Sequence, residues 1–184
     1  MSVQKKLYTF AEFETFTALS ENETRRFELF NGEIIEVSPS RPHGKITSLF
    51  VGEMYVAIKQ HSIVGELHVE VKHKLPGDNH TAMIPDVSFI KDTADLPTDS
   101  SPIPRMPDLA IEIKSPTNSY QQQRDKAAYY IANGSKRVWL VFAERRQVEV
   151  YRPGEDVIVL TDKDILDGGA VLPGFALAVK TIFS

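Results

Sequence analysis

The heptapeptide Asp108-Leu-Ala-Ile-Glu-Ile-Lys114 combines the clearest strand pattern of the chain with a pair of opposite charges. Because side chains alternate along a strand, its aliphatic residues Leu and Ile lie on one face, while Ala110, Glu112 and Lys114 share the other. The aliphatic residues predict a central strand, and buried charges are rare unless they are paired or coordinate a metal. The pattern leaves two interpretations open: a salt bridge between Glu112 and Lys114, or part of a catalytic site.

The segments on either side of this strand predict a mixed α/β protein. Thr9-Phe-Ala-Glu12 has the form of a capping box at a helix start, and Asn31-Gly32 favours the positive φ angles of a tight hairpin turn. Helices are predicted over about 9–20, 42–60 and 119–133, and strands over 26–30, 34–37, 67–75, 87–90, 108–114, 137–142, 148–151 and 157–160. We therefore expect an α/β fold with a mixed central sheet flanked by helices, preceded by an N-terminal helix and hairpin.

Length and composition limit the class of protein. The 184 residues are 42% hydrophobic and 25% charged, and we expect residues 1–184 to form a single domain. The absence of Cys excludes disulfides, thiolate metal sites and Cys nucleophiles, so any metal needs oxygen or imidazole ligands. No apolar run approaches the ~20 residues of a membrane span, and no signal-peptide pattern follows the first residues. We therefore expect a cytoplasmic protein without membrane contact.

The formal net charge of -4 conceals an uneven distribution along the chain. Residues 75–119 carry 7 acidic and 3 basic groups, whereas 41–74 and 120–146 have net charges of +2 and +4. Such asymmetry is expected where carboxylates gather a cation and neighbouring basic groups contact a polyanion. Ordinary variation of surface charge is the alternative.

A second acidic residue, Asp86, stands at the start of a short apolar run in Ile84-Pro-Asp-Val-Ser-Phe-Ile90. Taken alone, an Asp after a Pro is most simply the end of a turn. Together with Glu112 on a neighbouring strand and Lys114 two residues later, it provides what metal-assisted phosphodiester hydrolysis needs. Carboxylate oxygens are suitable ligands for Mg²⁺, and an ammonium group positions water or offsets developing negative charge.

Pro85-Asp86 followed by Glu112-Ile113-Lys114 resembles the signature of the PD-(D/E)XK nuclease superfamily, whose members share a restriction-endonuclease-like mixed-sheet fold. A wider series of motifs is similar to the bacterial endonuclease family of Uma-two type within that superfamily. The resemblance covers about residues 8–183. Its motifs are Phe27 to Glu33, Ser38-Pro39 with His43, Pro85-Asp86-Val87, Pro107 to Pro116, Asp125-Lys126 followed by Tyr129 or Tyr130, Gly134, Val138 to Val141 and Leu172 to Phe175.

This resemblance implies roles for acidic and neighbouring residues. Asp86 and Glu112 would ligate Mg²⁺ or Mn²⁺, with the main-chain carbonyl of Ile113 as a third ligand. Lys114 would orient the attacking water or stabilise negative charge at the scissile phosphate. Glu28 would be an additional catalytic carboxylate that holds a metal or its water from the N-terminal hairpin, although an exposed hairpin carboxylate is the alternative.

Basic residues in the two positive segments are candidates for contact with nucleic acid. In similar families a Lys or Gln of the helix after the motif strand reaches back into the site, which implies a catalytic or phosphate-binding role for Lys126. A solvated surface Lys is the alternative. His43 stands at the start of a helix, where free amides favour phosphate, but a lone His is also commonly structural. Lys45 and Arg124 complete the residues expected to bind nucleic acid.

These observations lead to one principal function and two alternatives. We expect a metal-dependent endodeoxyribonuclease that hydrolyses phosphodiester bonds in DNA with Mg²⁺ or Mn²⁺ and forms a homodimer to cut both strands. A non-catalytic DNA-binding or protein-interaction module with the same fold is the alternative from a different class. An enzyme that acts on RNA or another phosphodiester is the third candidate, and it is less favoured than the other two because no residue identifies a reader of the 2′-hydroxyl or of a base edge.

Overall fold

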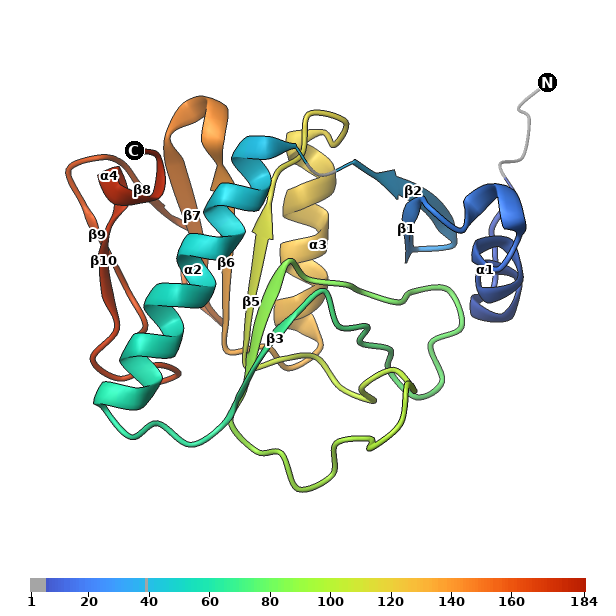
Figure 1. Cartoon of the computed structure of the whole chain (residues 1–184), viewed down its shortest axis with the longest axis horizontal. Coiled ribbons are helices and arrows are strands. Elements are labelled where there is room, and N and C mark those ends of the chain that lie inside the picture. Colours follow the sequence, from blue (N-terminus) through green and yellow to red (C-terminus); the bar gives the residue numbers. More distant parts are fainter. Residues whose placement is uncertain (1–5, 39) are drawn as a thin grey trace.

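A six-stranded mixed sheet forms the centre of the molecule, with a long helix on each face (Figure 1). The computed structural model describes residues 6–38 and 40–184, so Pro39 of the motif series lies outside the described residues. The strands are, in spatial order, β3 (Glu66–Val69), β4 (Val87–Ile90), β5 (Leu109–Ile113), β6 (Arg137–Phe142), β7 (Gln147–Tyr151) and β8 (Ile158–Leu160). Within the sheet, β5 and β6 are parallel and joined by a helical crossover, while the other neighbours are antiparallel.

The remaining elements cover this sheet or lie beside it. They are α1 (Phe10–Thr17), the 3-10 turn η1 (Ser20–Asn22), β1 (Arg26–Phe30), β2 (Glu33–Val37), α2 (Arg41–Gln60), α3 (Tyr120–Ala132), the 3-10 turn η2 (Ala143–Arg145), β9 (Ile165–Asp167), β10 (Ala176–Ala178) and α4 (Val179–Ile182). Strands β1 and β2 pair as one hairpin, and β9 and β10 pair as another. No helix in the described part of the chain is both long and apolar enough to cross a membrane. The predicted α/β fold with a flanked central sheet and an N-terminal helix and hairpin is confirmed.

The two faces of the sheet are covered by different elements. The apolar stripe of α2, which includes Ile46 and Phe50, packs together with the C-terminal segment against one face. This face carries the aliphatic residues of β5 and the fully buried Trp139. On the opposite face, α3 packs through Ala127 and Tyr130. Strand β5 is therefore central, and both of its faces are buried, including the face that carries its carboxylate.

The N-terminal helix and hairpin pack around a smaller apolar cluster. Thr9 caps α1 as predicted, since its hydroxyl accepts a hydrogen bond from the Glu12 amide and the Glu12 carboxylate accepts one from the Thr9 amide. The helix ends at Thr17 rather than near residue 20, because a separate 3-10 turn follows it. Asn31 and Gly32 have φ angles of 50° and 77°, which confirms the predicted hairpin turn.

Two parts of the chain differ from the sequence-based expectation. The strand predicted over 67–75 ends at Val69, because Glu70 has a φ of 54° that interrupts the extended backbone. Beyond this interruption, His73 pairs in an isolated bridge with Met83. The sequence pattern also does not predict β9, β10 or α4, since strands of 3 residues are too short to show a clear alternation.

Candidate active site

The pairing of β4 with β5 brings Asp86 close to the end of the central strand. Val87 pairs with Ile111, so Asp86, which directly precedes β4, lies beside the carboxyl end of β5. Oδ2 of Asp86 accepts a hydrogen bond of 2.6 Å from the amide of Ile113. The register of the sheet thus fixes this carboxylate next to Glu112.

Glu112 is buried and is held by two side chains of α3. Its Oε1 accepts a hydrogen bond of 2.8 Å from the hydroxyl of Tyr130, and its Oε2 accepts one of 3.2 Å from Nζ of Lys126. Tyr130 and Lys126 stand four residues apart on one face of the helix. The salt bridge between Glu112 and Lys114, which was the alternative interpretation of the motif strand, is wrong, because Lys126 is the cation beside Glu112.

Lys126 joins the central sheet to the N-terminal hairpin. Its Nζ forms a second ion pair, with Oε2 of Glu28 on β1. The side chains of Lys126 and Glu28 are only 3% and 9% exposed, so Glu28 is not the exposed hairpin carboxylate of the alternative interpretation. The structure gathers Glu28, Asp86, Glu112 and Lys126, and these four residues are called the carboxylate cluster below.

Burial and charge shift the protonation of the carboxylate cluster. Removal from water raises the pKa of Glu112 to about 8; the cation of Lys126 opposes this shift, and the negative charges of Glu28 and Asp86 add to it. Burial alone would lower the pKa of Lys126, but the charges of Glu112 and Glu28 outweigh burial and raise it. Lys126 therefore remains an ammonium ion at neutral pH.

His43 lies inside the site and not on the surface of its helix. It occupies the first turn of α2, where the hydroxyl of Ser40 accepts a hydrogen bond from its amide. The His43 ring is 5% exposed, and its Nε2 lies 3.0 Å from Oδ1 of Asp86. Burial would lower the pKa of His43, but the hydrogen bond and negative charge of Asp86 outweigh burial and raise it. Each oxygen of Asp86 thus has a protein partner.

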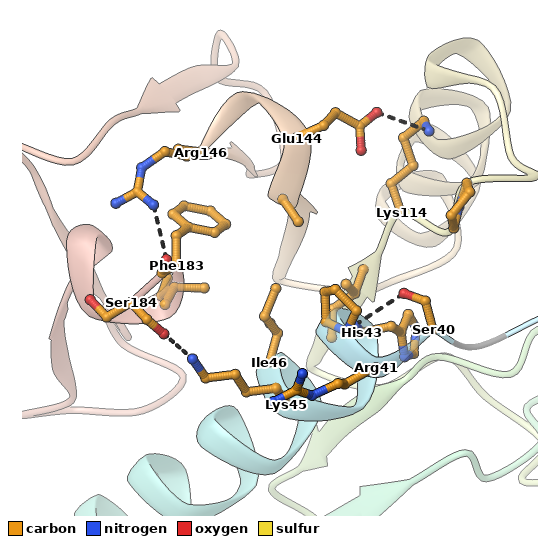
Figure 2. Close-up of a pocket in the computed structure, with 15 residues that line it drawn as sticks. Ser40, Arg41, His43, Lys45, Ile46, Lys114, Glu144, Arg146, Phe183 and Ser184 are labelled. Atoms are coloured by element: carbon orange, nitrogen blue, oxygen red, sulfur yellow. Dashed lines mark hydrogen bonds and ion pairs between the residues drawn. The ribbon is translucent and has the colours of Figure 1, made fainter.

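Lys114 pairs with Glu144 and not with a member of the carboxylate cluster, and Figure 2 shows the Lys114 and Glu144 side chains facing each other. The strand ends at Ile113, and Nζ of Lys114 lies 3.0 Å from the carboxylate of Glu144 and 4.9 Å from the centre of the Tyr120 ring. A hydrogen bond from Tyr120, together with the charge of Lys114, holds the pKa of Glu144 below its ordinary value. Because regular alternation stops with the strand, Lys114 does not share the surroundings of Glu112.

Two other basic residues expected to bind nucleic acid also lie outside the carboxylate cluster. Arg124 faces β7, where its guanidinium donates to both carboxylate oxygens of Glu149, at 2.6 and 3.1 Å. Lys45 is exposed on α2 and donates to the main-chain carbonyl of Ser184. Neither contact involves Asp86, so these residues border the site at most.

Tyr130 and Glu144 contact predicted site residues although neither was predicted as one. The position of Tyr130, four residues after Lys126 on a predicted helix, is a signal that identifies it. No local pattern identifies Glu144, which reaches Lys114 because the 3-10 turn η2 follows β6. Such a contact depends on the arrangement of elements and not on sequence spacing.

Two cavities open beside these residues, and His43 lines both of them. The smaller cavity, of about 210 Å³, is lined by Arg26, Glu28, Val37, His43, Glu70, Ile84 and Asp86. The larger cavity, of about 580 Å³, lies between the start of α2, the end of β5, η2 and the C-terminal segment (Figure 2). Two members of the carboxylate cluster therefore border the smaller cavity, and Lys114 borders the larger one.

The donor set of the carboxylate cluster fits a hard divalent cation in its chemistry. Three carboxylates, of Glu28, Asp86 and Glu112, face a single ammonium group, and carboxylate oxygens are the ligands that Mg²⁺ and Mn²⁺ prefer. Oε2 of Glu28 is buried and accepts no hydrogen bond from the described residues, apart from its ion pair with Lys126. Within 6–38 and 40–184, no three His, Asp or Glu side chains are already grouped to hold an ion.

The mixed sheet, its covering helices and the buried carboxylates at one strand end define an α/β protein with an acidic site in its interior. The fold matches the crystal structure of a protein from Anabaena variabilis ATCC 29413 that is described as "a putative nuclease belonging to DUF820". The TM-score is 0.78 and the sequence identity 23%, and the match covers 95% of this chain and 97% of that chain. A search of curated proteins gives no match.

The family of the chain follows from a second comparison. Residues 11–180 match the family model described as "Uma2: Putative restriction endonuclease". The chain belongs to this family, and the resemblance to the family of Uma-two type is confirmed. Membership of this family supports a nuclease-like function.

Proposed function

We propose that the protein is a metal-dependent nuclease of PD-(D/E)XK type that hydrolyses phosphodiester bonds in DNA, in the cytoplasm and as a homodimer. The observation that supports this most directly is the convergence of Glu28, Asp86 and Glu112 around Lys126 in a buried cluster beside a cavity. Burial of charged groups carries a large desolvation penalty, and strongly shifted pKa values gather at functional sites. In a family described as restriction endonucleases, such a cluster favours a catalytic role.

Each residue of the carboxylate cluster has its own role in the proposed reaction. Asp86 and Glu112, with the main-chain carbonyl of Ile113, hold Mg²⁺ or Mn²⁺, and Glu28 is the additional acidic ligand. When bound, the ion supplies positive charge to the scissile phosphate and to the attacking water. Lys126 keeps its ammonium group beside these carboxylates and offsets negative charge that develops on the phosphate.

The residues around the carboxylate cluster orient its side chains and contact the DNA strand. His43 fixes the orientation of Asp86 through its ring nitrogen. Lys114 borders the larger cavity, from which it contacts the phosphate backbone or positions water after its ion pair with Glu144 opens. Lys45, at the rim of the same cavity, and the more distant Arg124 are the proposed contacts with the DNA backbone.

Replacement of Glu112 by Gln tests the proposed mechanism. The substitution keeps the shape of the side chain but replaces a carboxyl group, the proposed metal ligand, by an amide, so we expect metal-dependent DNA cleavage to fall by about 100-fold or more. The measurement is a cleavage assay with supercoiled, linear, branched and single-stranded DNA and with RNA, in Mg²⁺ and in Mn²⁺. Glu53→Gln on the exposed side of α2 is the matched control, and it should cleave like the unaltered protein.

Circular dichroism of both variants distinguishes a loss of catalytic activity from a loss of folding. If the folded Glu112→Gln protein cleaves DNA at the unaltered rate, the proposed mechanism is wrong. Cleavage of RNA alone would identify the substrate as RNA and contradict the DNA assignment.

A non-catalytic DNA-binding module is the second candidate function. It is favoured by the absence of a preformed set of three metal ligands among the described residues and by the ion pairs that already engage Glu28 and Glu112. Calorimetric titration of the unaltered protein with Mg²⁺ and Mn²⁺ distinguishes the two candidates. Binding of neither ion, together with retained DNA binding, would support the non-catalytic module.

A further inference from the structure

The larger cavity beside His43 has an apolar wall. Its volume of about 580 Å³ lies within the roughly 300–1,000 Å³ range of small-molecule sites. Ile46 of α2, Ile113 of β5, Ala143 of η2 and Phe183 of the C-terminal segment line it, and Figure 2 shows Ile46 and Phe183 around the same open space. A flat group of low polarity, such as a nucleobase, fits against this combination of aliphatic and aromatic surfaces.

The rim of this cavity carries four cationic side chains, two of which are neutralised by carboxylates. These pairs are Lys114 with Glu144 at 3.0 Å and Arg146 with Asp162 at 2.8 Å. The other two cations, Arg41 and Lys45, are exposed in the first turns of α2. Lys45 donates to the main-chain oxygen of Ser184, and among residues 6–38 and 40–184 Arg41 forms no ion pair. The amino end of a helix adds partial positive charge at the same place, so this part of the rim attracts an anion such as phosphate.

The cavity adjoins the carboxylate cluster. His43 lines the cavity and contacts Asp86 through its ring, and the cavity-lining residues Ile113 and Lys114 directly follow Glu112. The larger cavity and the carboxylate cluster therefore share His43 and meet at the carboxyl end of β5.

We propose that the larger cavity binds one nucleotide of the DNA strand beside the scissile phosphate. The base lies against Ile46 and Phe183, and the phosphate of that nucleotide contacts Arg41 and Lys45. The assignment to a DNA strand rests on the proposed nuclease function, whereas the fit to a nucleotide rests on the cavity itself. Stacking against apolar surfaces tolerates all bases, so little base preference is expected.

Calorimetric titration without any divalent metal tests this site separately from catalysis. The probes are deoxyadenosine 5′-monophosphate, deoxyadenosine and inorganic phosphate. The nucleotide uses both the apolar wall and the rim, so we expect it to bind at least about tenfold more tightly than either fragment. A nucleotide that binds no more tightly than inorganic phosphate would overturn the proposal.

Paired variants of α2 locate the binding. The double variant Arg41→Gln/Lys45→Gln should weaken binding of the nucleotide by about tenfold or more. Lys59→Gln, an exposed cation near the other end of the same helix, is the matched control and should leave the affinity unchanged. Equal affinities of the double variant and the control would place the nucleotide elsewhere and overturn the site.

Ala143→Trp provides a second, independent variant because the indole would fill the cavity from η2. We expect it to abolish nucleotide binding in a preparation whose circular dichroism matches that of the unaltered protein. Retained binding in such a folded variant contradicts the site, and if the variant does not fold, the α2 variants decide.

Binding of a single-stranded trinucleotide tests whether the larger cavity accepts part of a DNA strand or only a free nucleotide. If the cavity holds part of a strand, the trinucleotide binds at least as tightly as the mononucleotide, whereas weaker binding would contradict the assignment to DNA. If the protein binds the nucleotide but does not cleave DNA with any metal, the nucleotide site stands and the proposed nuclease function is wrong. If the protein cleaves DNA but does not bind the nucleotide, the nuclease function stands and the proposed nucleotide site is wrong.

Discussion

At the scale of single residues, Lys126 is the cation that balances Glu28 and Glu112 in the interior. Lys126→Met keeps most of the apolar volume but leaves both carboxylates without this partner. Removal of one member of a buried ion pair typically costs about 3–5 kcal/mol, so we expect a loss of that size in the free energy of unfolding. Urea denaturation measures it.

Lys136→Met is the matched control for this substitution. Lys136 is exposed after α3, and a surface substitution of this kind usually changes stability by no more than about 0.5 kcal/mol. If the two variants unfold at the same urea concentration, the ion pairs of Lys126 do not hold the carboxylates in the interior.

His73 makes the stability of the protein depend on pH. Burial lowers its pKa from 6.5 to about 4, so the folded protein keeps the ring neutral at pH values where the unfolded chain binds a proton. Stability from this residue is present above pH 6.5 and is lost as the pH falls towards 4, by about 3 kcal/mol in total.

Urea unfolding at pH 7 and pH 4.5 measures this effect. The loss of stability between the two pH values should be smaller in His73→Gln than in the unaltered protein. His61→Gln, whose ring is exposed, should keep the full loss. An equal pH dependence in all three proteins would show that His73 is not the titrating group.

The sequence predicted which candidate residues come together where backbone geometry decides their position. Glu112 lies on β5 and Asp86 directly precedes the paired strand β4, and alternation along β5 separates the aliphatic face from the carboxylate. Strand alternation does not predict the position of Lys114, because this residue lies one position beyond the end of β5 and its side chain pairs with Glu144. Lys126 takes the place beside Glu112, and that depends on how α3 packs across the sheet, which spacing does not determine.

At the scale of elements, α3 supplies two of the side chains that hold Glu112, and its start is fixed by a capping box. The hydroxyl of Ser119 accepts a hydrogen bond from the Gln122 amide at 3.1 Å, and the Gln122 side chain accepts one from the Ser119 amide at 2.8 Å. Ser119→Ala should lower the free energy of unfolding by about 1 kcal/mol, as determined by urea denaturation. Ser119→Asp retains an acceptor and should restore most of the loss; equal stabilities of the two variants would contradict the capping role.

Elements with strong periodicity or capping signals were predictable, and short elements were not. The helix from Ser119 and the hairpin around Asn31 follow from local hydrogen bonding and positive φ angles. The break of the predicted strand at Glu70 has no local sequence signal, since a left-handed Glu is unusual. Strands β9 and β10 pair with each other and bury Leu166 and Leu177 against the main core, so they depend on tertiary packing.

At the scale of the whole molecule, we propose that the chain is a single domain that associates as a homodimer. Helix α2 and the C-terminal segment share one core with the sheet, which favours unfolding as a unit. Differential scanning calorimetry should therefore show one transition, and its midpoint should rise with protein concentration, because dissociation accompanies unfolding of a dimer. Two transitions would divide the chain into domains, and a midpoint independent of concentration would count against the dimer.

The carboxylate cluster joins Glu28 of β1 to Lys126 of α3, which are separated by more than half of the chain. During synthesis on the ribosome, the hairpin emerges long before the helix that completes the cluster. Contacts between segments so distant in sequence form late, after the intervening strands have found their partners. A partly synthesised chain therefore carries the acidic residues without their arrangement, and the proposed cleavage of nucleic acid would begin only once the carboxylate cluster has assembled.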